Sequence, residues 1–234
     1  MKKNTRYVKN GYEAIMFPME TCNITQGDNV GSHLGTYAVD LTGKDTRRDY
    51  AYFPFSAVSK ALDVPQNGNA VCWESLNKVL FADGTIDYCT MLVVHDNDPT
   101  GTSPGNKYSQ GQQMAQEGTA GKATGNHLHI EVAKGKFTKM YTRNAQGTAH
   151  LPNNIPIEKA CFMDDTVIIK GVANWKYLKD IVDNKIDQIL EKGSRVNFPT
   201  RVEVVQVYAD NTCDVIIGGK IIKGIPTGPL TEVK

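Results

Sequence analysis

The sequence predicts a mainly β protein built from antiparallel sheet, and three observations carry this prediction. Short alternating or apolar runs recur along most of the chain, separated by turns containing Gly, Asn, Asp or Pro. Helical periodicity is nearly absent before residue 176. Strand patterns return after residue 193. We therefore expect a β domain over residues 1–175, a helical connector over 176–192 and a small β-barrel over 193–234.

Length and charge restrict the function classes. The 234 residues suffice for one domain and a smaller one. With 26 basic and 25 acidic residues the net charge is +1, which argues against a nucleic-acid partner. No run of 18 apolar residues is present, so we expect no membrane span. The N-terminus lacks the apolar segment of a secretory signal, so we expect the chain to be made as a cytoplasmic protein, whatever its final site of action.

The cysteines do not form a metal-binding pattern. Five are dispersed along the chain without a Cys-x-x-Cys pair, at Cys22, Cys72, Cys89, Cys161 and Cys213. Such an odd, scattered set predicts free thiols and no cysteine zinc site. Most are expected to be small core residues.

The first chemically interesting segment joins a polar loop to a short strand. Residues 23–32 are polar and precede His33, and residues 37–41 are predicted as a strand that carries Asp40. An imidazole and a carboxylate separated by a Gly-containing turn can converge on one cation. The alternative is a loop histidine and an aspartate that caps a turn.

Short strands are predicted next, over residues 50–58, 70–76 and 88–94. The last of these is a buried-type apolar run, and His95 follows it directly. Strand ends commonly carry catalytic groups. The alternative is a histidine satisfied at the edge of the core.

A glycine-rich loop leads into the most informative strand. Residues 97–126 contain no Gly-Lys-Ser/Thr before a helix, so they predict a groove rim rather than a phosphate cradle. In residues 127–132, apolar side chains alternate with His127, His129 and Glu131. The two imidazoles should be about 6.5–7 Å apart at Cα and face one space. The alternative is a strand with two solvated histidines.

The C-terminal part changes pattern twice. Between 176 and 192, apolar residues recur at spacings of three and four, which predicts the helical connector. Strand patterns then alternate with turns up to residue 230 and predict a small barrel. This tail contains no histidine, so it offers no candidate catalytic group.

The histidines as a set indicate a catalytic metal site. Four of the five are His33, His95, His127 and His129, and His150 is expected to be a solvated loop residue. A catalytic zinc needs three protein ligands and an open position. His33, Asp40 and one histidine of the His127/His129 pair would supply these three ligands. Two imidazoles are then left for proton transfer.

These motifs, in this order, resemble the lysostaphin-type zinc endopeptidases that cut the peptide cross-links of bacterial peptidoglycan. The resemblance covers residues 12–135. It implies one zinc bound by His33, Asp40 and His129, with His95 and His127 as the catalytic pair. The family usually has three residues between the first His and the Asp, whereas six stand between His33 and Asp40 here. A turn or bulge must absorb the extra residues; otherwise Asp45 or Asp49 is the ligand.

The tail resembles the bacterial SH3-like wall-binding modules attached to many such enzymes. A peptidase joined to such a module resembles a bacteriophage endolysin, acting as a monomer on the cell wall after release by a holin, or alternatively from the virion. Peptidoglycan would then be both the substrate and the ligand of the tail. Two alternatives remain open: a zinc-dependent peptidoglycan amidase, and an inactive wall-binding or virion structural module.

Overall fold

The computed structural model describes residues 1–44, 48–64, 68–99 and 102–164. Beyond them it describes the backbone of five strands: β18 (Ile168–Gly171), β19 (Lys179–Asp180), β20 (Glu203–Val207), β21 (Thr212–Ile217) and β22 (Lys220–Pro226). The chain divides into two compact units, Met1–Gln188 and Ile189–Lys234, which are described separately.

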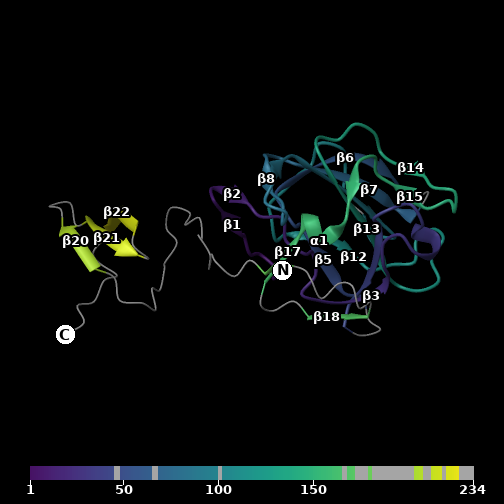
Figure 1. The fold of residues 1–234 in the computed structure, drawn as a ribbon, viewed down its shortest axis with the longest axis horizontal. Helices are drawn as coiled ribbons and strands as arrows, with labels where there is room; N and C mark the ends of the chain where they lie inside the picture. Colours follow the sequence, from purple (N-terminus) through teal and green to yellow (C-terminus); the bar gives the residue numbers. More distant parts are fainter. Residues whose placement is uncertain are drawn as a thin grey trace. The chain divides into compact units, whose positions relative to one another are not determined.

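A nine-stranded sheet dominates the first unit (Figure 1). Every neighbouring pair in it is antiparallel except β18 with β3. The predicted antiparallel β class is therefore confirmed for the described residues. The strands run in the order β11 (Lys107–Tyr108), β6 (Ala57–Asp63), β7 (Ala70–Ser75), β10 (Cys89–Val94), β13 (Leu128–Lys134), β4 (Val39–Thr42), β3 (Thr21–Gln26) and β18, and β16 (Asn154–Ile155) also pairs with β13.

Smaller two-stranded ribbons surround this sheet. Helix is limited, among the described residues, to the single turns α1 (Ile157–Ala160) and η1 (Gly31–His33). The ribbons are β1 (Val8–Lys9) with β2 (Tyr12–Glu13), β5 (Tyr50–Tyr52) with β12 (Gln113–Gln116), β8 (Val79–Leu80) with β9 (Ile86–Asp87), β14 (Thr142–Arg143) with β15 (Ala149–His150), and β17 (Phe162–Met163) with β19.

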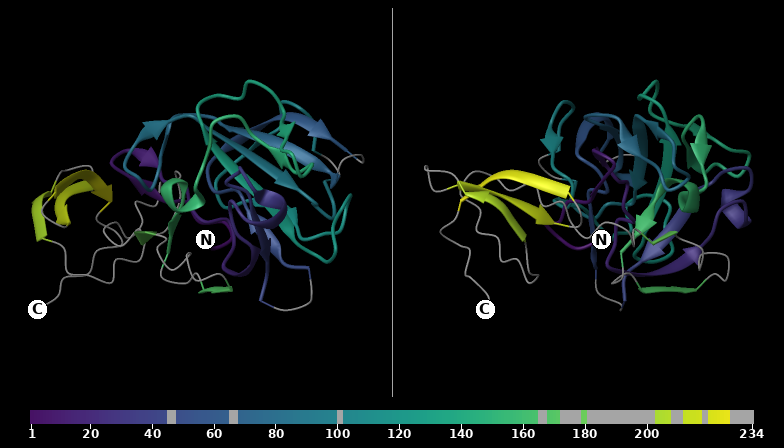
Figure 2. Two further views of the ribbon diagram at one scale, coloured as in Figure 1. Left: turned by 45° about the vertical axis from the view of Figure 1, so that its right-hand side comes forward. Right: turned by 60° about the vertical axis from the view of Figure 1, so that its left-hand side comes forward.

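Strand β13 is buried on both faces, which corrects the expectation of one exposed polar face. Leu128, Ile130 and Val132 point into the main core, where aromatic rings such as Phe53 and Trp73 pack edge to face at 4.7 Å. The opposite face carries a second apolar cluster in which Ala133 packs with cluster members that include Leu92, Val94, Ala149 and Leu151. The cause is the β14–β15 region, which Figure 2 shows running outside the sheet. The period-two pattern correctly predicted which residues of β13 share a face. Whether the polar face is buried depends on the β14–β15 region, which is distant in sequence.

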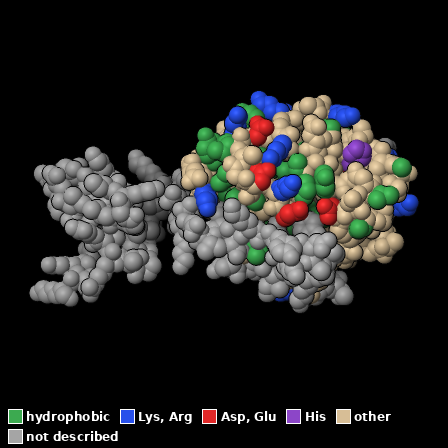
Figure 3. All heavy atoms as spheres, in the orientation of Figure 1, with side chains coloured by type: hydrophobic (Ala, Val, Ile, Leu, Met, Phe, Trp, Pro, Cys, Tyr) green, Lys and Arg blue, Asp and Glu red, His purple; other side chains and the backbone are tan. Residues whose placement is uncertain are grey.

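Two further expectations can be compared with the structure. The cysteines at 22, 72, 89 and 161 are free and buried, as predicted, and the side chain of Cys213 lies outside the described residues. Acidic and basic side chains are interspersed on the face shown in Figure 3, in keeping with the net charge of +1. Within the described ranges, no helix has both the length and the apolar character needed to cross a bilayer.

The C-terminal predictions are only partly covered. Of the proposed connector over 176–192, the structure describes Lys179 and Asp180, which form β19 beside β17 rather than helix; the rest lies outside the described residues. In the second unit, β20, β21 and β22 form a three-stranded antiparallel sheet. The boundary at residue 192 and the barrel over 193–234 remain predictions.

Candidate metal centre

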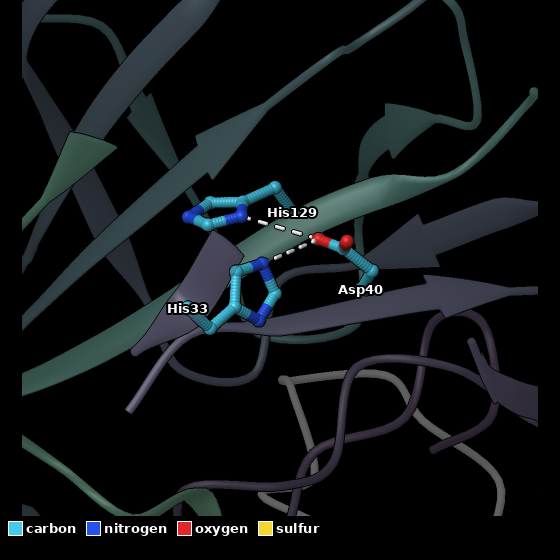
Figure 4. Close-up of side chains that lie close together, drawn as sticks. All are labelled: His33, Asp40 and His129. Carbon is cyan, nitrogen blue, oxygen red and sulfur yellow. Dashed lines mark hydrogen bonds and ion pairs between the residues drawn. The ribbon is translucent and has the colours of Figure 1, made fainter. Parts of the chain in front are cut away.

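Three side chains with metal-ligand chemistry converge on the central sheet. His33, Asp40 and His129 each offer one ligand atom, and these atoms all lie within 4.8 Å of one another (Figure 4). Strand pairing explains two of the three positions, because β4 and β13 are adjacent and His129 is directly opposite Asp40 in their register. Both side chains of such a pair project to the same side of the sheet.

His33 reaches the same point from a compact turn. It ends the 3-10 turn η1, and its backbone N–H donates to Val30 while its carbonyl accepts from Thr36. Gly35 takes a left-handed conformation (φ +79°), and β3 has a bulge opposite Asp40. The turn that contains Gly35, closed by the hydrogen bond from Thr36 N–H to the His33 carbonyl, accommodates the extra residues between His33 and Asp40.

Side chains from the β14–β15 hairpin brace this turn. Asn144 Nδ2 donates to the carbonyls of Ser32 and Leu34, and Thr148 Oγ1 donates to the Ser32 carbonyl. The pattern before residue 135 gave no sign of these contacts, since they join segments more than 100 residues apart in sequence.

The electrostatics of the three groups favour a bound cation. Asp40 Oδ1 lies 3.3 Å from His33 Nε2 and 3.1 Å from His129 Nδ1. Burial raises the pKa of Asp40, but hydrogen bonds and charge interactions with the two imidazoles outweigh burial and hold this pKa well below its usual range. For His33, burial lowers the pKa, and the Asp40 carboxylate more than compensates, so the pKa is raised. The carboxylate is therefore ionised at neutral pH.

The orientation of each imidazole is also defined. His33 Nδ1 lies 3.0 Å from the Gly27 carbonyl; a carbonyl can only accept, so Nδ1 carries a proton, and Nε2 is the nitrogen that faces Asp40 and would bind a metal. His129 presents Nδ1 to Asp40, and its Nε2 is buried without a hydrogen-bond partner. Two imidazole nitrogens and one carboxylate oxygen are the donors that a zinc site with an open position uses. The residues present therefore fit zinc.

The other two histidines lie beside this group as a second pair. The rings of His95 and His127 are 4.5 Å apart, and His95 is 6.4 Å from His129. His127 Nε2 is 3.8 Å from Asp40 Oδ1. Nδ1 of His95 donates to the Ala120 carbonyl at 2.5 Å, and Nδ1 of His127 donates to the Gly125 carbonyl at 2.8 Å. Nδ1 of each ring is thereby occupied, and Nε2 is the nitrogen left for a substrate.

Glycines allow the backbone to approach His95 closely. His95 follows β10 with φ +69°, an uncommon conformation for a residue with a side chain. Its N–H donates to Gly68, and a Cβ on Gly68 would lie 2.9 Å from Val94 and 3.0 Å from the Ala120 carbonyl. A Cβ on Gly118 would lie 2.4 Å from the His95 carbonyl. Burial lowers the pKa of His95 to about 4, so this ring is neutral at neutral pH.

The remaining candidates lie elsewhere. His150, expected to be solvated, is half-buried in β15, where Nε2 contacts the Thr142 hydroxyl at 2.9 Å, because residues 142–150 fold into a hairpin on the sheet. Asp49 accepts a hydrogen bond from Lys44 N and is not among the converging groups, and Asp45 lies outside the described residues. The sequence analysis assigned no role to Glu131, which is a buried carboxylate two residues beyond His129. The period-two pattern did indicate that Glu131 and His129 share one face of the strand.

Comparison with known proteins finds a phage protein among the relatives. No protein-family model matches the sequence. Morphogenesis protein 1 of Bacillus phage B103 is 36% identical over 170 residues, which is 71% of this chain and 45% of that protein. The chain thus spans less than half the length of this relative.

Two solved structures show weaker likeness. The catalytic domain of the antimicrobial peptidase lysostaphin from Staphylococcus simulans has 18% identity and a TM-score of 0.34, over 53% of this chain and 81% of that one. A zinc-containing peptidase from Vibrio cholerae has 18% identity and a TM-score of 0.36, over 53% and 41%. At this level of similarity the functional conclusion rests on the side chains of this chain.

Proposed function

We propose that this chain is a zinc-dependent endopeptidase that cleaves peptide bonds in the stem or cross-bridge of peptidoglycan. The observation that carries the proposal is the convergence of His33, Asp40 and His129 beside a second imidazole pair, His95 and His127. The substrate class follows from the resemblance of this ordered motif set to the lysostaphin-type peptidases. No geometric feature of the site alone selects peptidoglycan.

The roles of the five residues follow from their surroundings. His33 Nε2, Asp40 Oδ1 and His129 Nδ1 would hold the zinc, which when bound polarises the scissile carbonyl and activates water. Burial keeps His95 neutral, and its Nε2 lone pair suits it to accept a proton from the attacking water. His127, next to the Asp40 carboxylate, is assigned as the hydrogen-bond donor to the developing oxyanion.

Product analysis tests the reaction and the substrate together. We expect purified peptidoglycan of a susceptible type to release fragments with new amino groups on stem or cross-bridge amino acids, identified by mass spectrometry. A zinc chelator should stop the release and added zinc should restore it, because the carbonyl loses its electrophilic partner. Release of peptides freed from their lactyl linkage would instead establish the amidase alternative. Absence of any product from several wall types, with zinc bound, would leave the inactive-module alternative.

The phage relative bears on where the enzyme acts. That relative is named as a morphogenesis protein, which favours the virion-associated alternative over the endolysin role that the sequence predicted. Both remain proposals, with peptidoglycan as the substrate in each. Peptides of this chain in purified phage particles support the virion-associated role, whereas presence only in the infected-cell lysate supports the endolysin role.

We further propose that the tail after residue 192 binds the cell wall and raises the local concentration of the peptidase there. The support is its separation as a compact unit and its three-stranded sheet. Truncation after Lys192 should leave cleavage of a small soluble peptidoglycan fragment nearly unchanged, while lysis of whole cells falls markedly. A fusion of the tail to a fluorescent protein should decorate cells. Equal loss of both activities on truncation would show that the tail completes the catalytic fold instead.

A further inference from the structure

One face of β13 carries a buried carboxylate that the proposed reaction does not use. Glu131 is 1% exposed and shares its face with His129, two residues earlier. Side chains at i and i+2 of a strand are neighbours on one side of the sheet. Burial raises the pKa of Glu131, and the charge interaction with His129 offsets part of this rise.

The two oxygens of Glu131 are in different situations. Oε2 accepts a hydrogen bond from Leu151 N at 2.6 Å, which anchors the segment that covers this face. Oε1 is buried and has no hydrogen-bond partner. A buried polar atom left without a partner costs about 1–3 kcal/mol, so an unpaired carboxylate oxygen in a folded protein points to a partner of some kind.

His129 also has a buried polar atom without a hydrogen-bond partner. Its Nδ1 faces Asp40, and its Nε2 is buried without a partner. An imidazole that ligates a metal through one nitrogen carries its proton on the other, and that N–H commonly donates to a carboxylate. The structure thus holds a buried donor position and a buried acceptor without partners on one face of one strand.

Asn154 is the competing partner for Glu131. It stands opposite Ala133 in the pairing of β16 with β13, and its amide lies near enough to the Glu131 carboxylate to lower the pKa of Glu131. No hydrogen bond of ordinary geometry is formed, however, because Asn154 Nδ2 and Glu131 Oε1 both lack a partner. An amide donor, however, is neutral, whereas the N–H of a metal-bound imidazole is the more acidic donor and forms the stronger bond with a carboxylate.

We propose that Glu131 Oε1 accepts the Nε2–H of His129 when Nδ1 ligates zinc, and that Glu131 is thereby a positioning residue for this ligand. The proposal rests on the zinc site of the proposed function. Glu131 fixes the tautomer and the ring orientation of His129, and its negative charge makes Nδ1 a stronger ligand. Its bond to Leu151 N ties the same carboxylate to the covering segment.

Zinc affinity of the full chain tests the proposal without any measurement of catalysis. Glu131→Gln keeps the size of the side chain but not its charge, and should raise the zinc dissociation constant by about 10- to 100-fold, measured by competition with a chelator. Glu131→Ala should do so at least as strongly. In zinc-loaded protein, the Nε2–H proton of His129 should be protected from solvent exchange in NMR spectra, and should shift and exchange faster in Glu131→Gln.

Two control variants separate positioning from general stability. Val132→Ala removes core volume from the opposite face of the same strand and should lower the melting temperature without weakening zinc binding. Asn154→Ala removes the competing partner and should keep the wild-type zinc affinity. Wild-type affinity in Glu131→Gln, or equal weakening in Asn154→Ala, would overturn the proposal. If wild-type protein binds no zinc at all, the proposed function fails and this proposal with it; if wild type binds zinc and cleaves while Glu131→Gln binds equally well, only this proposal fails.

Discussion

Replacing His129 by alanine is expected to remove most of the zinc from the protein, and activity on peptidoglycan should fall to background. Among the described residues, His129 Nδ1 is one of three candidate ligand atoms, and it lies 3.1 Å from Asp40 Oδ1, whereas His127 Nε2 lies 3.8 Å from the same oxygen. Zinc content of purified protein by elemental analysis, with wild type expected at one zinc per chain, measures the effect. His33→Ala should behave in the same way.

Matched variants make this test specific. His150→Ala removes a histidine that is also half-buried in the same unit but is bonded to Thr142 rather than to the centre, so it should keep its zinc. Asp40→Ala should lose zinc, since its carboxylate contacts His33, His127 and His129. Full zinc content in His129→Ala would contradict the ligand assignment. Full zinc content in Asp40→Ala would transfer the oxygen ligand to Asp45 or Asp49.

His95→Ala and His127→Ala are expected to keep zinc and lose turnover by about 10²–10⁴-fold, the usual contribution of a positioned acid–base group. Both rings donate Nδ1–H to backbone carbonyls and keep Nε2 for the substrate, so each can take part in proton transfer or hydrogen bonding without being a ligand. The rate of release of soluble fragments, divided by zinc content, gives the effect. Since His95 and His127 act on one transition state, the double variant should lose little more than either single variant.

The assignment within the His127-x-His129 pair has a clear contrary outcome. Loss of zinc in His127→Ala together with full zinc in His129→Ala would exchange the roles of the two residues. The geometry favours His129 as the ligand, because His129 Nδ1 lies 3.1 Å from Asp40 Oδ1 whereas His127 Nε2 lies 3.8 Å from it. His127 Nδ1 donates instead to the Gly125 carbonyl.

Local sequence patterns were enough to locate the strands that carry the site. The runs predicted over residues 70–76 and 88–94 correspond to β7 and β10, and the alternation over residues 127–132 corresponds to β13. These patterns are local because side-chain direction alternates with period two whatever the rest of the chain does. The same local logic placed His95 at a strand end and put His129 and Glu131 on one face.

Convergence and burial could not be read from those patterns. His33, Asp40 and His129 meet because β4 pairs with β13 in one particular register, which joins residues 89 positions apart. The spacing between His33 and Asp40 required a turn or a bulge, and the folded chain uses a turn, which contains Gly35 and lies between η1 and β4. Register between distant strands depends on the packing of the whole sheet, so no window of sequence contains it.

Sequence was therefore sufficient for the identity of the chemical groups, their order and the face on which each stands. Folding decided which of them meet and how much water reaches them. His129 and Glu131, expected on an exposed face, are 4% and 1% exposed because residues up to Leu151 cover that face. Burial of this kind arises from contacts between segments far apart in the chain, and it places the two side chains out of water beside the candidate metal centre.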